Sequence, residues 1–86
     1  MASIEEVRAA IAQAVEKAGQ SVNALQQAAD LAEDAQALLS TATQGSVQAD
    51  VEQANARFAE VVSGVTDLQK HLGAGISQAE SINSRL

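Results

Sequence analysis

Small and apolar residues recur every seven positions along nearly the whole chain, and this spacing constrains the fold more than any other feature. The repeat begins at Ile4 in the first half of the chain and at Val51 in the second. A seven-residue repeat keeps its members on one stripe of an α-helix, whereas a β-strand would need alternate residues to be apolar. The sequence therefore predicts an all-α fold built from two long amphipathic helices.

The composition agrees with a helical fold. Proline, tryptophan, tyrosine and cysteine are absent, there is one phenylalanine, and alanine fills roughly a fifth of the positions, so propensity favours helix over strand. Without cysteine the chain can form neither disulfides nor thiolate metal sites. This absence leaves the redox compartment of the protein open.

The heptad repeat stops once, near the middle of the chain, where Gly45 can adopt the left-handed backbone that ends many helices. Ser3 and Glu6 have the capping-box spacing that starts a helix. Near the carboxyl end, Gly73 and Gly75 leave open a break in the second helix. The expected elements of this single domain, residues 1–86, are helix 3–42, turn 43–46 and helix 47–86, with any break at 73–76.

A connection this short makes the two helices antiparallel neighbours, so we expect a rod-like hairpin roughly 60 Å long. Residues equally far from Gly45 should lie level with each other, which would bring Glu33 near Arg57 and Glu5 near Arg85. We expect the larger apolar residues at the first and fourth heptad positions to form the hairpin core. They are Ile4, Ile11, Leu25, Leu39, Val51, Phe58, Val61, Val65, Leu68, Leu72 and Ile82.

More apolar residues flank this core than a two-helix hairpin can bury. We expect the following residues to form an interface with another chain: Val15, Val22, Leu31, Leu38, Val62 and Ile76. A hairpin buries one stripe per helix, and a further exposed apolar stripe marks a binding surface. Two hairpins that pair into a four-helix bundle would cover it, so we expect a homodimer or a heterodimer with a similar hairpin.

The sequence offers no set of residues suited to catalysis. His71 is the only histidine, and a metal site or an acid–base pair would need companions that the pattern does not supply. No glycine-rich phosphate loop, nucleophile elbow or zinc-ligand spacing occurs. We therefore expect a protein that is not an enzyme and has no catalytic, cofactor-binding or metal site.

Acidic side chains outnumber basic ones by eleven to five, and the resulting net charge of −6 disfavours binding to nucleic acid. No stretch has the length of a transmembrane segment or the pattern of a signal peptide. We expect a cytoplasmic protein, or one secreted without a cleavable signal peptide. The acidic residues near the turn are Asp30, Glu33, Asp34, Asp50 and Glu52. They could bind a basic protein or a divalent cation, although a solvated surface is the simpler interpretation.

The chain resembles the Trp-x-Gly (WXG) family of small type VII secretion substrates, because it is acidic, lacks cysteine and is expected to form two helices about a central glycine. The family motif lies in the turn, where this chain has Thr43, Gln44 and Gly45, so the glycine is kept and the tryptophan is missing. The family's export signal pairs a tyrosine with an acid four residues later, and here Ile76 and Glu80 have that spacing but the tyrosine is missing. The resemblance implies a helical hairpin that is secreted or acts as a secretion adaptor.

These observations favour a non-catalytic protein–protein interaction module. The alternative is a phasin-like amphipathic protein that coats a lipid or polyester surface, because long amphipathic helices also bind at such interfaces.

Overall fold

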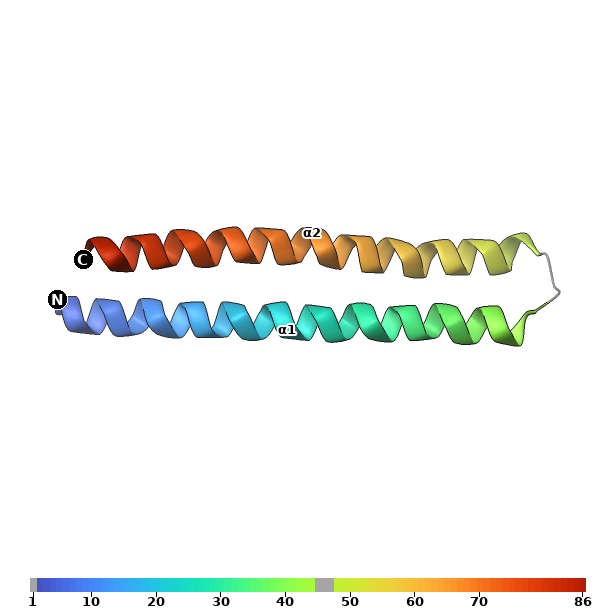
Figure 1. Cartoon of the computed structure of the whole chain (residues 1–86), viewed down its shortest axis with the longest axis horizontal. Helices are drawn as coiled ribbons and strands as arrows, with labels where there is room; N and C mark the ends of the chain where they lie inside the picture. The colour runs from blue at the N-terminus through green and yellow to red at the C-terminus, as the bar shows by residue number, and fades with distance from the viewer. Residues whose placement is uncertain (1, 45–47) are drawn as a thin grey trace.

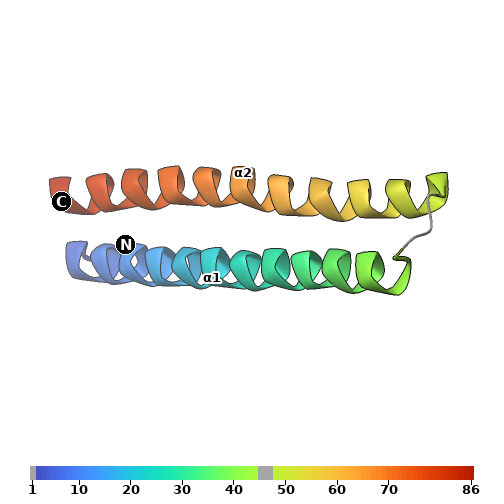
Figure 2. The ribbon, with the colours of Figure 1, turned by 45° about the vertical axis from the view of Figure 1, so that its right-hand side comes forward.

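The computed structural model consists of two antiparallel helices, α1 (Ile4–Ala42) and α2 (Ala49–Arg85), and it describes residues 2–44 and 48–86. Both chain termini lie at the same end of the molecule (Figure 1). The helices stay side by side along their length when the view is turned by 45° (Figure 2). The molecule measures 64 × 18 × 15 Å. The predicted all-α hairpin is therefore confirmed, while Gly45 lies outside the described residues.

The start of α1 is determined by Ser3. Its backbone is extended, and its hydroxyl oxygen accepts a hydrogen bond of 3.1 Å from the backbone N–H of Glu6. This bond satisfies one of the free N–H groups of the first turn. At the other end, the hydroxyl of Thr43 donates to the carbonyl of Leu39 at 2.7 Å. The predicted N-cap is confirmed, and α1 ends at the predicted Ala42.

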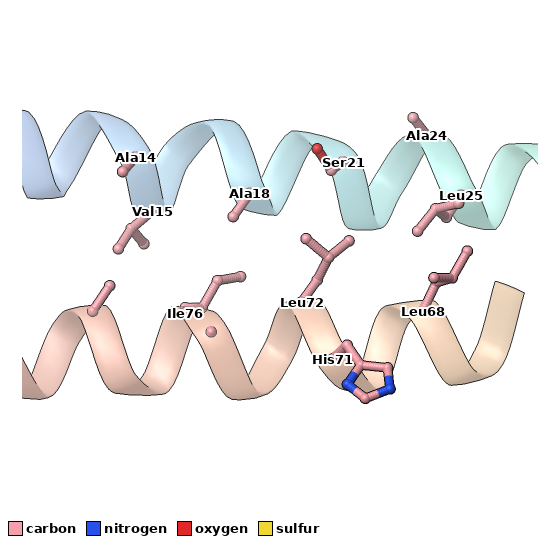
Figure 3. Close-up of a pocket in the computed structure, with 12 residues that line it drawn as sticks. Ala14, Val15, Ala18, Ser21, Ala24, Leu25, Leu68, His71, Leu72 and Ile76 are labelled. Carbon is pink, nitrogen blue, oxygen red and sulfur yellow. The ribbon is translucent and has the colours of Figure 1, made fainter.

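The second helix begins later than predicted and has no break. Gln48 precedes its first turn without a side-chain cap bond, and the carboxylates of Asp50 and Glu52 lie at its positive end. The helix then continues through segment 73–76, where a break had been left open. Leu72, just before this segment, and Ile76, within it, are partly buried and point toward α1 (Figure 3). Their packing offsets the low helix propensity of the two glycines.

The seam between the helices is formed by residues spaced alternately by four and three. We count Ile4 in α1 and Val51 in α2 as first heptad positions, so the seam consists of the first and fifth positions. In α1 the partly or fully buried members are Ile11, Val15, Ala18, Val22, Leu25, Ala29, Ala32, Gln36 and Leu39. In α2 they are Val51, Asn55, Phe58, Val62, Val65, Gln69, Leu72, Ile76, Ala79 and Asn83. Within the described part of the chain, Ala29 and Val65 alone are buried, with 5% and 6% exposed.

Amide side chains set the register of the two helices. The Gln69 amide donates to the Val22 carbonyl at 3.2 Å, and the Gln36 amide donates to the Asn55 carbonyl at 3.0 Å. The ion pairs expected from the sequence do not form: among residues 2–44 and 48–86 the one ion pair joins Arg57 to Glu60 within α2, at 3.5 Å. Hydrogen bonds near the seam therefore replace the predicted surface ion pairs.

The glycines of α2 provide a test of the unbroken helix. A Cβ atom added at Gly73 would meet no atom within 4 Å, and alanine loses less backbone entropy in a helix than glycine. We expect Gly73→Ala to raise the free energy of unfolding by about 0.5–1 kcal/mol, and Ala74→Gly to lower it by a similar amount. Urea denaturation followed by circular dichroism measures both changes. Equal stability of all three proteins would contradict a continuous helix at this place.

Candidate interaction surface

Large apolar side chains remain exposed along one side of the hairpin. Leu38 is 71% exposed, Leu31 61% and Leu68 53%, although each is large enough to belong to a core. The other large apolar residues that are exposed in the described chain are Ile4, Val7, Val61, Ile82 and Leu86. Single exposed leucines are common on protein surfaces, whereas a row of them along one face indicates a binding site.

Helical geometry explains why these residues share a face. A fourth-position residue lies about 60° from the first-position row, on the side away from the fifth-position row. Because α2 runs opposite to α1, the fourth-position rows of both helices fall on the same side of the seam. Leu31 and Leu38, at the seventh position, extend the row of α1, while Val61, Leu68 and Ile82 form the row of α2. We call this side of the hairpin the apolar face.

A groove of about 820 Å³ runs along part of the apolar face. In Figure 3, Val15 and Leu25 of α1 point toward α2, while Leu68 and Leu72 of α2 point toward α1. Most of the remaining lining residues are small: Ala14, Ala18, Ser21, Ala24, Gly75 and Ala79. Because side chains of this size cannot fill the space between two helices, the groove is hollow and open to solvent.

The opposite side of the seam is polar and joined by hydrogen bonds. The Gln69 amide donates to the Gln26 side chain at 3.2 Å, and the Asn55 amide donates to the Ser40 hydroxyl at 3.3 Å. These residues occupy the second and fifth heptad positions, which adjoin each other on the helix surface. We call this side the polar flank. The hairpin therefore has two unlike sides, one with polar side chains that form hydrogen bonds between the helices and one with apolar side chains exposed.

The structure corrects the predicted division between core and interface. Four residues assigned to an outer interface, Val15, Val22, Val62 and Ile76, lie partly buried in the hairpin seam. The seam takes the fifth position because in α1 that row contains valines, whereas the fourth row holds mostly alanine and serine after Val7. The exchange displaces Val61, Leu68 and Ile82 from the predicted core to the apolar face.

The remaining predicted core and interface residues divide between the two environments. Ile4, assigned to the core, is 59% exposed beside the start of α1, where the seam has no further turn of helix to cover it. Leu31 and Leu38 are exposed, as an interface with another chain would require. Partly or fully buried are Ile11, Leu25, Leu39, Val51, Phe58, Val65 and Leu72.

Residues capable of acid–base or metal chemistry are dispersed. His71 is exposed and lies at the edge of the groove, with its ring pointing away from α1 (Figure 3). No three His, Cys, Asp or Glu side chains converge on a metal position in the part of the chain that the structure describes. The acidic residues near the turn, Asp30, Glu33, Asp34, Asp50 and Glu52, are all exposed. In residues 2–44 and 48–86, no helix has the length and hydropathy needed to cross a bilayer.

Two valines of α2 distinguish the seam from the apolar face. Val65 is 6% exposed and Val61 is 47% exposed. We expect Val65→Ala to lower the free energy of unfolding by roughly 1–3 kcal/mol through lost burial and the cavity left behind, and Val61→Ala to lower it by well under half as much. The measurement is urea denaturation at submicromolar protein, so that self-association does not contribute. Equal losses would mean that the fourth heptad position belongs to the seam after all.

Comparison with known proteins gives no match to a protein-family model, to a curated protein sequence or to a solved structure. The resemblance to the Trp-x-Gly family therefore stays a prediction about architecture. The role of this chain has to be argued from its exposed surfaces.

Proposed function

We propose that this hairpin is a non-catalytic interaction module that pairs, through its apolar face, with another helical hairpin. The partner is a second copy or a related chain. The observation that carries the proposal is the row of leucine and valine side chains beside an open, apolar groove. Another helical surface fits such a face because helices pack by inserting side chains into hollows of the facing helix.

The exposed area of the chain supports the same proposal. A compact monomer of 8.8 kDa exposes about 4,800 Å² of surface, whereas this chain exposes 6274 Å². The excess of about 1,500 Å² is larger than the roughly 800 Å² that one partner buries in a stable complex. The single hairpin buries little apolar surface between its helices, so a partner that covers its apolar face would add to its stability.

Secretion by a type VII system is the cellular setting that the Trp-x-Gly resemblance suggests for such a module, as substrate or adaptor. The hairpin architecture of the described residues supports it, together with the presence of Gly45 in the sequence. Export that depends on the system's ATPase, followed with an epitope-tagged chain in the source cell and in a strain lacking that ATPase, tests this setting.

The leucines of the apolar face test the pairing. We expect Leu31→Glu and Leu38→Glu each to weaken association at least about tenfold, because a carboxylate would have to be buried against apolar groups. Ala37→Glu is the matched control, since Ala37 is exposed, neighbours Leu38 and lies away from the apolar face. Sedimentation equilibrium of the three variants and the parent chain measures the dissociation constants. A parent chain that is a stably folded monomer at micromolar concentration would contradict the proposal.

The same exposed apolar residues keep the phasin-like alternative in view, since an opened hairpin could lie on a lipid or polyester surface. Charge opposes it. The chain carries five basic residues against eleven acidic ones, and interfacial helices bind anionic headgroups with lysine and arginine.

Flotation separates this alternative from protein pairing. We expect the purified chain to stay at the bottom of a density gradient in the presence of liposomes of phosphatidylcholine and phosphatidylglycerol, because its net charge of −6 is repelled by the anionic headgroups. Liposomes of phosphatidylcholine alone are the control for charge. Flotation of the chain with either preparation would favour the surface-coating alternative.

A further inference from the structure

The apolar face has two unlike halves. The cross-helix bonds from Gln36 to Asn55 and from Gln69 to Val22 show which residues lie level, and they place Val61 about level with Leu31. The half that contains Leu31, Leu38 and Val61 therefore presents large side chains. The half nearer the termini contains the groove, which is lined mainly by small residues. Along α1, the half nearer the turn therefore protrudes and the half nearer the termini is hollow, while α2 exposes large side chains in both halves, with Val61 in one and Ile82 in the other.

We propose that the partner of the apolar face is a second copy of this chain, packed face to face and antiparallel, so that the protruding half of each copy fills the hollow half of the other. This inference rests on the proposed function and names its partner. In this arrangement α1 lies on α1 of the second copy, with Leu38 over Ala14 and Leu31 over Ser21 of that copy. Val61 then lies about level with Leu68 of α2 in that copy.

The opposite orientation gives a poor fit. If two copies packed with their turns at the same end, α1 would lie on α2 of the second copy and large residues would meet large residues, such as Leu31 and Val61. The two grooves would then face each other and leave a void between them. Unfilled space at an apolar contact is destabilising because the lining atoms lose their packing partners. Size complementarity along α1, where leucines meet alanine and serine, therefore selects the antiparallel orientation.

Charge selects the same orientation. The protruding half carries six acidic residues and one basic residue: Asp30, Glu33, Asp34, Asp50, Glu52, Glu60 and Arg57. The other four basic residues lie in the hollow half: Arg8, Lys17, Lys70 and Arg85. Copies with their turns together would bring two acidic ends into contact. The antiparallel orientation separates those ends and brings Lys17 near Asp34 of the second copy, which favours association.

The available area is sufficient for a stable dimer. The two longer dimensions of the hairpin are 64 and 18 Å, so its broad side offers on the order of 1,000 Å² per copy. With Leu38 over Ala14, the two copies are shifted only slightly along their long axes, so most of their length stays in contact. The area buried by both copies together then lies within or above the 1,200–2,000 Å² that is typical of specific complexes, on the order of what such a dimer needs.

Cysteine cross-linking tests the orientation, because the parent chain contains no cysteine. Leu38→Cys protein is mixed with Ala14→Cys protein and, separately, with Ala54→Cys protein, and each mixture is oxidised gently. In the antiparallel dimer Leu38 faces Ala14, whereas in the parallel dimer it faces Ala54. We expect several-fold more mixed disulfide with Ala14→Cys than with Ala54→Cys, since a disulfide needs its Cβ atoms within about 4.5 Å. Sedimentation of each variant confirms that it still associates.

The outcomes distinguish this inference from the proposed function. Mixed disulfide mainly with Ala14→Cys supports both. A dimer that cross-links mainly with Ala54→Cys overturns the antiparallel inference and leaves the interaction module standing. A chain that neither associates nor folds cooperatively by itself overturns the second copy as partner and points to a related hairpin instead. A stably folded monomer overturns both.

Discussion

The choice of which two heptad rows face each other determines the rest of this structure. In each helix the first and fifth positions form the seam, and they bring valine, isoleucine and a few amides between the helices. The amides Gln36, Asn55 and Gln69 then lie where they can bond to the facing helix, and they form the polar flank. The fourth-position row is left over on the other side, where it becomes the apolar face.

The sequence predicts the helices well because their determinants are local. The heptad spacing, the Ser3 cap and the absence of proline all act within a turn or two of helix, and the observed bounds of α1 agree with the expected ones. The choice between the fourth and fifth rows is not local. In α2 the fourth row, with Val61, Leu68 and Ile82, is the more apolar one, and only its pairing with the valines of α1 moves the seam. Polar residues at the fifth position, such as Gln36 and Gln69, were the available signal, because amides there can bridge two helices.

The division into a polar flank and an apolar face also supports the proposed role as an interaction module. Its polar flank fixes register and keeps that side compatible with water, while its apolar face leaves a groove of about 820 Å³ next to exposed leucines. Shape and charge vary along the face, and in the proposed antiparallel dimer unlike parts of the two faces meet. Such a surface would favour one orientation of the bound partner.

The central claim is that the hairpin is one half of a side-by-side assembly. Small-angle X-ray scattering at micromolar concentration, combined with mass from light scattering, tests it most directly. The account predicts twice the 8.8 kDa mass of one chain in a particle only slightly longer than the 64 Å of the hairpin. A particle of single-chain mass with a radius of gyration near 19.4 Å would contradict it, because the apolar face would then be stable in water without a partner.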